Sequence, residues 1–185
     1  MKKKKFITVA IDSEASAGGG TQAKLISKHY NLYYLDTGKI YRYIAYLKKK
    51  NPKRFNYNFI KKKIKNIKIL HLKNINLLSE EVGLVASQIS KKLKLRKMVN
   101  KFQKKCAYSP PKNYNGSCLD GRDITTVILP NAMFKFFICA NLNIRTKRRY
   151  LELKKYNNNT SIEDVRKSIE FRDKSDYGRK HSPLK

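Results

Sequence analysis

Acidic residues are scarce in this chain. Its 185 residues include 13 Asp and Glu against 43 Lys and Arg, which gives a formal net charge of +30. Taken alone, this charge would suit a polyanionic partner such as nucleic acid or an anionic membrane surface. The lysines are spread through every segment, however, and the sequence has no arginine-rich tail and no aromatic RNA-recognition motif. This distribution favours a general compositional bias, so a dedicated nucleic-acid partner is not expected.

Cysteines, histidines and long apolar runs are also few. The three cysteines show no C-x-x-C spacing and the three histidines are scattered, so no metal site is indicated. Cys118 and Cys139 lie in apolar, strand-like runs and are expected to be buried thiols of a reducing compartment. No apolar run is long enough to cross a membrane, and Asp12 ends the first one too early for a signal peptide. We therefore expect a cytoplasmic protein with no membrane partner.

The most informative segment is residues 6–21, FITVAIDSEASAGGGT. A short apolar run ends at Asp12 and is followed by small residues, three consecutive glycines and Thr21, after which the pattern becomes helical. A strand, a glycine-rich turn and a helix N-terminus in this order direct backbone N–H groups and the helix dipole at one point, which can bind phosphate. Thr21 stands where a hydroxyl can hold Mg²⁺ on the bound phosphates. A glycine-rich turn with only a structural role is the alternative.

This segment aligns most closely with a variant of the Walker A pattern G-x-x-x-x-G-K-[ST] that ends in G-K-G-T, and it departs from that variant at two positions. Ser13 replaces the first glycine, and Gly19 replaces the lysine that places a positive charge on the transferred phosphate. Lys24, or one of residues 2–5, could substitute for that lysine. If the site is otherwise intact, Gly19→Lys is expected to raise turnover. Glu14 adds a negative charge that should repel ATP unless the side chain points away.

The remaining local patterns alternate between strands and helices. Strands are predicted at residues 33–35, 117–119 and 133–140, with a further short strand possible at 69–72. Helices are predicted at residues 21–30, 38–50, 59–67, 80–92 and 93–108, with two more after the capping residues Asn141 and Ser161.

Several polar residues follow the predicted strands. Arg42 lies one turn into a helix, where it could clamp a phosphate or remain a solvated cation. The sequence DGRD at residues 120–123 ends a strand, and its two carboxylates and its arginine are costly to bury unless a ligand or partner satisfies them. The basic run at residues 145–149 opens another helix and indicates either a bound anion or an exposed basic face.

Taken together, these blocks resemble the bacterial cytidylate kinases, a family of P-loop nucleoside monophosphate kinases. The resemblance spans nearly the whole chain and rests on IDSEASAGGGT, LDTGKIYR, VASQIS, Arg96, LDGRDITTVILP, NIRTKRRYLEL and RDKSDYGR. It implies a monomeric enzyme that transfers the γ-phosphoryl group of ATP, with Mg²⁺, to CMP or dCMP. It also implies a three-layer α/β P-loop fold in which a parallel sheet is flanked by helices.

The resemblance also assigns regions and residues by position. The single domain, residues 1–185, would have a core of 1–50 and 111–185, an acceptor-binding insertion at about 51–110 and a short lid at about 141–160. The ATP-binding residues would be Ser13, Glu14, Ala15, Ser16, Ala17, Gly18, Gly19, Gly20 and Thr21. The acceptor-binding residues would be Thr37, Arg42, Ser87, Arg96, Asp123, Arg172, Asp176 and Arg179. Catalysis by positioning and charge neutralisation would fall to Arg42, Asp123, Arg145, Arg148 and Arg172, of which Arg145 and Arg148 belong to the lid.

Members of this family continue beyond the position of residue 185 through another strand and helix. The resemblance therefore predicts an unpaired apolar strand at residues 133–140, either in a truncated fragment or in a protein that covers the edge differently. Two alternatives to an active kinase stay open. One is a catalytically weak or inactive nucleotide-binding relative, and the other is a basic nucleic-acid-binding protein on a kinase-like scaffold, whose RNA binding would depend steeply on salt.

Overall fold

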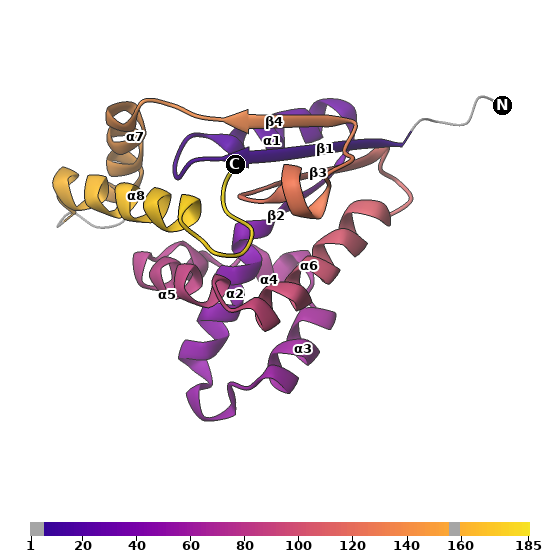
Figure 1. Ribbon diagram of the computed structural model, residues 1–185, viewed down its shortest axis with the longest axis horizontal. Coiled ribbons are helices and arrows are strands. Elements are labelled where there is room, and N and C mark those ends of the chain that lie inside the picture. Colours follow the sequence, from indigo (N-terminus) through magenta and orange to yellow (C-terminus); the bar gives the residue numbers. More distant parts are fainter. Residues whose placement is uncertain (1–5, 156–159) are drawn as a thin grey trace.

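A computed structural model describes residues 6–155 and 160–185 (Figure 1). Its centre is a four-stranded sheet in the order β2-β3-β1-β4. The strands are β1 (Ile7–Ser13), β2 (Tyr33–Asp36), β3 (Gly116–Gly121) and β4 (Phe134–Ile138). All three pairings are parallel. The predicted α/β fold, with a parallel sheet flanked by helices, is confirmed.

Helices cover both faces of this sheet. The helix α1 (Gly19–Tyr30) packs on one face, where Val9 and Ile11 of β1 join Ala23 in a small buried cluster. Ala10, which points to the opposite face, belongs to the larger core formed with α2 (Thr37–Lys50) and α6 (Leu93–Tyr108). The period of two along a strand places alternate residues in different layers.

The segment between α2 and α6 contains only helices and helical turns. It consists of η1 (Pro52–Arg54), α3 (Tyr57–Lys65), α4 (Ile69–Leu72), η2 (Ile75–Leu78) and α5 (Glu80–Ser90). Figure 1 shows these elements gathered with α2 and α6 below the sheet. The amphipathic helices expected at 59–67 and 80–92 correspond to α3 and α5.

Two local predictions are wrong. Residues 69–72 form the single turn α4 and not a strand, because the backbone N–H of Lys68 donates to the His71 ring at 3.1 Å and closes the turn. Cys139 is exposed and not buried. It follows β4, which pairs with β1 on one side only and lies at the edge of the sheet. Cys118, in the central strand β3, is buried as predicted.

The helices α7 (Leu142–Lys154) and α8 (Ile162–Tyr177) pack together beyond the end of β4 (Figure 1). Their predicted caps are confirmed: Asn141 accepts a hydrogen bond from the backbone of Asn143, and Ser161 accepts one from the backbone of Asp164. None of the helices in the described ranges is long and apolar enough to span a lipid bilayer.

The short π turn η3 (Ile124–Ile128) follows the DGRD sequence and is held by Asp12 at the end of β1. The buried Asp12 carboxylate accepts hydrogen bonds from the backbone N–H groups of Ile124 and Thr125, both at 2.8 Å. These bonds fix the DGRD segment next to the phosphate loop, because β1 carries both Asp12 and the start of that loop.

Candidate functional site

The segment between β1 and α1 borders a cavity of about 660 Å³. The chain passes through Ser16 and Gly18 with φ of 60° and 98°, and α1 begins directly after Gly18. The first N–H groups of a helix have no partner within the helix and, with the dipole, favour a bound anion. Eight of the nine residues predicted to bind ATP line this cavity: Ser13, Glu14, Ser16, Ala17, Gly18, Gly19, Gly20 and Thr21. The ninth, Ala15, is buried against α8.

Glu14 and Arg145 join this loop to α7 and α8. The buried Arg145 side chain donates to the carbonyl oxygen of Ala15 at 3.0 Å and pairs with the carboxylates of Asp173 and Glu14. Glu14 also accepts a hydrogen bond from the Tyr177 hydroxyl at 3.3 Å. These partners counter the expected repulsion between Glu14 and ATP. Arg145 lies under the loop, whereas Arg148 lines the cavity itself.

A second cavity, of about 290 Å³, lies beside the first at the carboxyl ends of β2 and β3. Ligands of parallel α/β sheets bind at this end. It brings together all eight predicted acceptor residues: Thr37, Arg42, Ser87, Arg96, Asp123, Arg172, Asp176 and Arg179. We call it the acceptor cavity. Five residues line both cavities: Ser16, Asp36, Asp120, Arg122 and Arg149.

Arg42 and Arg172 reach α5 at the same residue, Gly83. A Cβ atom on Gly83 would lie 2.8 Å from a terminal nitrogen of Arg42 and 2.6 Å from one of Arg172. Arg42 also donates to the carbonyl oxygen of Leu77 at 2.7 Å, which holds its guanidinium group at this wall. Two guanidinium groups so placed can bind the oxygens of one phosphate through several charge-assisted hydrogen bonds.

Buried ion pairs form the inner wall of the acceptor cavity. Arg96 lies 3.2 Å from Asp123, and Arg179 lies 3.3 Å from Asp176. Burial raises the pKa of Asp123, while Arg96 and Arg179 oppose that rise. Two guanidinium nitrogens of Arg179 are buried without a hydrogen-bond partner in the part of the chain that the structure describes. Such donors are costly to leave unsatisfied, and the oxygen atoms of a bound substrate would satisfy them.

Two further arginines of the site lie in patterns that indicate a bound ligand, but the sequence assigns neither of them a role of its own. Arg122, within DGRD, pairs with Asp176 at 3.0 Å and donates to the Ser13 hydroxyl at 3.2 Å. Arg149, within the basic run, lines both cavities and lies 2.9 Å from Glu152. The DGRD sequence indicates a site, but it does not predict which groups its arginine contacts.

The carboxylates of Asp36 and Asp120, which line both cavities, could bind a divalent cation. Burial, and then the charge of Asp36, raise the pKa of Asp120 to about 7. The Asp120 Oδ1 atom has no hydrogen-bond partner within residues 6–155 and 160–185. Over those ranges no group of three or more His, Cys, Asp or Glu could hold a metal alone. Mg²⁺ often takes one or two carboxylates together with substrate phosphates, so these residues fit an ion that arrives with a nucleotide.

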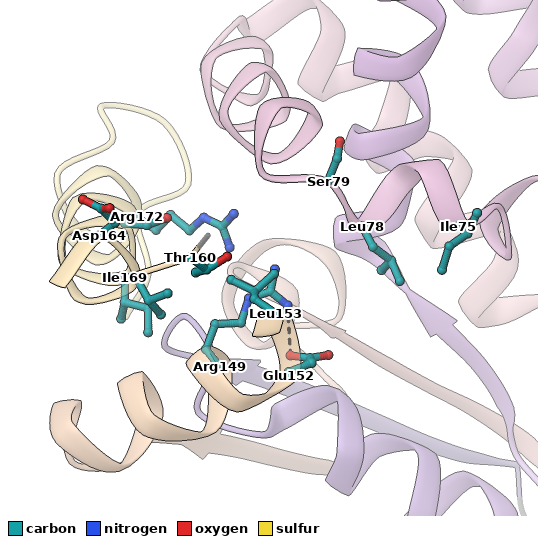
Figure 2. Close-up of a pocket in the computed structure, with 12 residues that line it drawn as sticks. Ile75, Leu78, Ser79, Arg149, Glu152, Leu153, Thr160, Asp164, Ile169 and Arg172 are labelled. Atoms are coloured by element: carbon teal, nitrogen blue, oxygen red, sulfur yellow. Dashed lines mark hydrogen bonds and ion pairs between the residues drawn. The ribbon is translucent and has the colours of Figure 1, made fainter. Parts of the chain in front are cut away.

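A third hollow, of about 400 Å³, lies between η2 and the α7–α8 pair. Figure 2 shows Ile75, Leu78 and Ser79 on one side and Ile169 and Arg172 on the other. Its walls are mostly apolar, and Arg172 belongs both to this hollow and to the acceptor cavity. The hollow lies next to α7, the helix that carries Arg148 and Arg149.

A parallel sheet, a phosphate loop ahead of α1 and an adjoining arginine-rich acceptor cavity together define a P-loop nucleoside monophosphate kinase. A family model described as cytidylate kinase matches residues 9–185. The chain belongs to the cytidylate kinase family, whose members phosphorylate CMP with ATP.

Curated relatives support this assignment. The cytidylate kinase of Bartonella tribocorum is 39% identical over 98% of this chain and 83% of its own length. Those of Clostridium tetani and Thermosipho melanesiensis are 40% and 36% identical, over 97% and 96% of this chain and 82% and 83% of their own lengths. The predicted enzyme class is thereby confirmed, and a nucleic-acid-binding protein on a kinase-like scaffold is not favoured.

Proposed function

We propose that this chain transfers the γ-phosphoryl group of ATP to CMP or dCMP, giving ADP and CDP or dCDP. One observation carries the proposal: the predicted acceptor residues line one cavity, the phosphate loop lines the next, and five residues border both. In-line phosphoryl transfer requires donor and acceptor to be held next to one another, and it depends mainly on positioning and charge neutralisation.

The acceptor cavity would hold the nucleoside monophosphate. Arg42 and Arg172, which meet at Gly83, are placed to fix its phosphate, and Arg122 stands between that phosphate and the loop. Asp123 and Asp176 would accept hydrogen bonds from the cytosine amino group or the ribose hydroxyls and would orient the arginines. Thr37 and Ser87 supply hydroxyl groups, although the Thr37 hydroxyl already donates to the Asp120 carbonyl oxygen.

The phosphate loop would hold ATP at the N-terminus of α1. Thr21, Asp36 and Asp120 are the residues that would hold Mg²⁺ together with the nucleotide phosphates. The ion, when bound, supplies positive charge that neutralises the phosphate oxygens. The chain's own contribution is to direct backbone N–H groups and guanidinium groups at the phosphates before the reaction starts.

The segment at about 141–160 would act as the lid over the phosphates. It contains α7, with Arg145 and Arg148, whereas its residues 156–159 lie outside the described part. Closure would exclude water and so suppress hydrolysis of ATP. We further propose that the protein acts as a monomer in the cytoplasm. The three free cysteines and the lack of C-x-x-C spacing suit a reducing compartment.

A coupled ADP-release assay tests the proposal, with ATP, Mg²⁺ and each of CMP, dCMP, UMP and AMP as acceptor. We expect ADP release that depends on CMP or dCMP. The lysine-less loop favours one second candidate, a catalytically weak relative that still binds nucleotides. Saturable binding of CMP and ATP by folded protein, without ADP release, would support that candidate.

A further inference from the structure

Gly19 cannot carry a side chain next to Ser13 as the loop is built. A Cβ atom on Gly19 would lie 2.5 Å from the Ser13 Oγ and 2.7 Å from the Ser13 Cβ. Ser13 is the last residue of β1, is buried and is fixed by its pairing with Ile138 of β4. Its Cβ cannot rotate away, since rotation about χ1 moves only the hydroxyl. Ser13 therefore excludes a lysine at position 19. The two departures from the Walker A pattern depend on one another, because a serine at position 13 requires a glycine at position 19.

The phosphate-loop cavity must then obtain its positive charge elsewhere. The cations that line it are Lys24, Arg122, Arg148 and Arg149. Arg122 is paired with Asp176, and Arg149 with Glu152. Lys24 also lines this cavity and is the rival cation. Residues 2–5, the other possible substitutes, lie outside the described ranges.

Arg148 contacts the backbone of the loop between β1 and α1. Its guanidinium group donates to the Ser16 carbonyl oxygen at 2.8 Å, and a Cβ on Gly18 would lie 3.1 Å from one of its nitrogens. Arg145, three residues earlier on the same face of α7, anchors the helix to the loop through the Ala15 carbonyl oxygen. The backbone contact uses only part of the five-donor guanidinium group, so further donors remain for phosphate oxygens.

We propose that Arg148 supplies the phosphate-binding cation that Ser13 excludes from position 19. The proposal rests on the ATP-dependent function proposed above and adds a dependence between positions. A lid arginine that acts independently of the loop would be equally important with or without a lysine at position 19. Here Arg148 is essential because the loop has Ser13 and Gly19, and it becomes less important once those residues are Gly and Lys.

A mutant cycle tests this dependence. Arg148→Gln is made in the natural chain and in the double variant Ser13→Gly/Gly19→Lys, and the dissociation constant of MgATP and kcat with CMP are measured for all four proteins. In the natural chain, we expect Arg148→Gln to lower kcat by about 100-fold or more and to weaken MgATP binding about 10-fold. In the double variant, we expect the same substitution to cost less than about 10-fold in kcat.

Two single variants serve as controls. Lys147→Gln removes the same charge from an exposed neighbouring residue of α7 and should leave both quantities within about 2-fold. Lys24→Gln tests the rival cation. Equal losses on Arg148→Gln in both backgrounds would overturn the proposal, and so would a loss on Lys24→Gln that disappears in the double variant.

If CMP is not phosphorylated, the measurements of MgATP binding still test the role of Arg148. Failure of turnover in the natural chain would refute the proposed function, while the MgATP cycle would still confirm or refute the role of Arg148. Absence of MgATP binding in every folded variant would refute both. If the double variant does not fold, the natural background decides: Arg148→Gln must weaken MgATP binding and leave CMP binding unchanged, and equal weakening of both would contradict the proposal.

Discussion

Arg96 and Asp123 form a buried ion pair in which a terminal guanidinium nitrogen lies 3.2 Å from the Asp123 Oδ2. Only 3% and 7% of the two side chains are exposed. Arg96 also donates to the Tyr41 hydroxyl at 3.2 Å and lies over its ring. A charge buried this deeply is tolerated because its partner is fixed in place, and removal of one partner leaves the other uncompensated.

We therefore expect Arg96→Gln to lower the free energy of unfolding by about 3 kcal/mol at pH 8. The loss depends on pH. Burial already raises the pKa of Asp123, and removal of Arg96 raises it further, so the native state binds a proton that the unfolded state releases. Stability then falls as pH rises above the ordinary carboxylate range, and the variant should be less impaired at pH 5 than at pH 8.

Urea unfolding at pH 5 and pH 8 measures this effect. Lys97→Gln, which removes an exposed cation from the next position of α6, is the matched control and should change stability little at either pH. A loss for Arg96→Gln that is the same at both pH values would contradict the uncompensated-carboxylate explanation.

Arg172→Ala should weaken CMP binding far more than ATP binding. Arg172 lines the acceptor cavity and meets Arg42 at Gly83, whereas it does not border the phosphate-loop cavity. Loss of a charge-assisted contact to the acceptor phosphate is expected to raise the CMP dissociation constant by about 10- to 100-fold. Calorimetric titration with each nucleotide measures both constants, and equal weakening would show that the acceptor assignment is wrong.

The sequence predicted the parts of the site that depend on local order. The glycine-rich segment after β1 and the DGRD sequence after β3 were recognisable because each follows an apolar strand, and parallel strands place their carboxyl ends together. Thr37 and Asp123 also follow strands, whereas the family resemblance was needed to predict that Arg172, on the distant helix α8, joins them in one cavity.

The parts that were missed depend on tertiary contacts. Arg122 and Arg149 are two of many cations in a basic chain, and only their positions between the cavities distinguish them. The collision between Ser13 and Gly19 arises from the path of the loop, so the expectation that Gly19→Lys alone raises turnover did not include it. With the structure, we expect that substitution to succeed only with Ser13→Gly.

Asp120 makes stability depend on pH when metal and nucleotide are removed. Burial and the charge of Asp36 raise its pKa to about 7, above the ordinary carboxylate value of 3.8. The native state therefore binds the proton more tightly than the unfolded state, and this contribution to stability is lost as pH rises from about 4 to about 7. In EDTA, Asp120→Asn should flatten the decline and be more stable than the natural chain at pH 8.

Thermal unfolding in EDTA between pH 4 and pH 8 measures this slope for both proteins. The same Asp120→Asn variant should lose most of its Mg²⁺-dependent activity, because a carboxylate that fits the cation has become a neutral amide. If the variant keeps full activity with Mg²⁺, Asp120 does not hold the metal. A parallel slope in the two proteins would instead remove Asp120 as the source of the pH dependence.

At high protein concentration, the edge strand β4 should promote aggregation of the proposed monomer. Phe134, Phe136 and Phe137 are each more than 40% exposed, and within the described ranges no strand pairs with its outer edge. An exposed apolar edge is a template for pairing with another chain. We expect Phe136→Lys to reduce light scattering at high protein concentration, with little change in thermal stability because the ring is already 42% exposed.

Phe171→Lys, on the exposed side of α8, is the control for added charge alone. Equal reductions in scattering by both variants would show that net charge, and not the β4 edge, governs association.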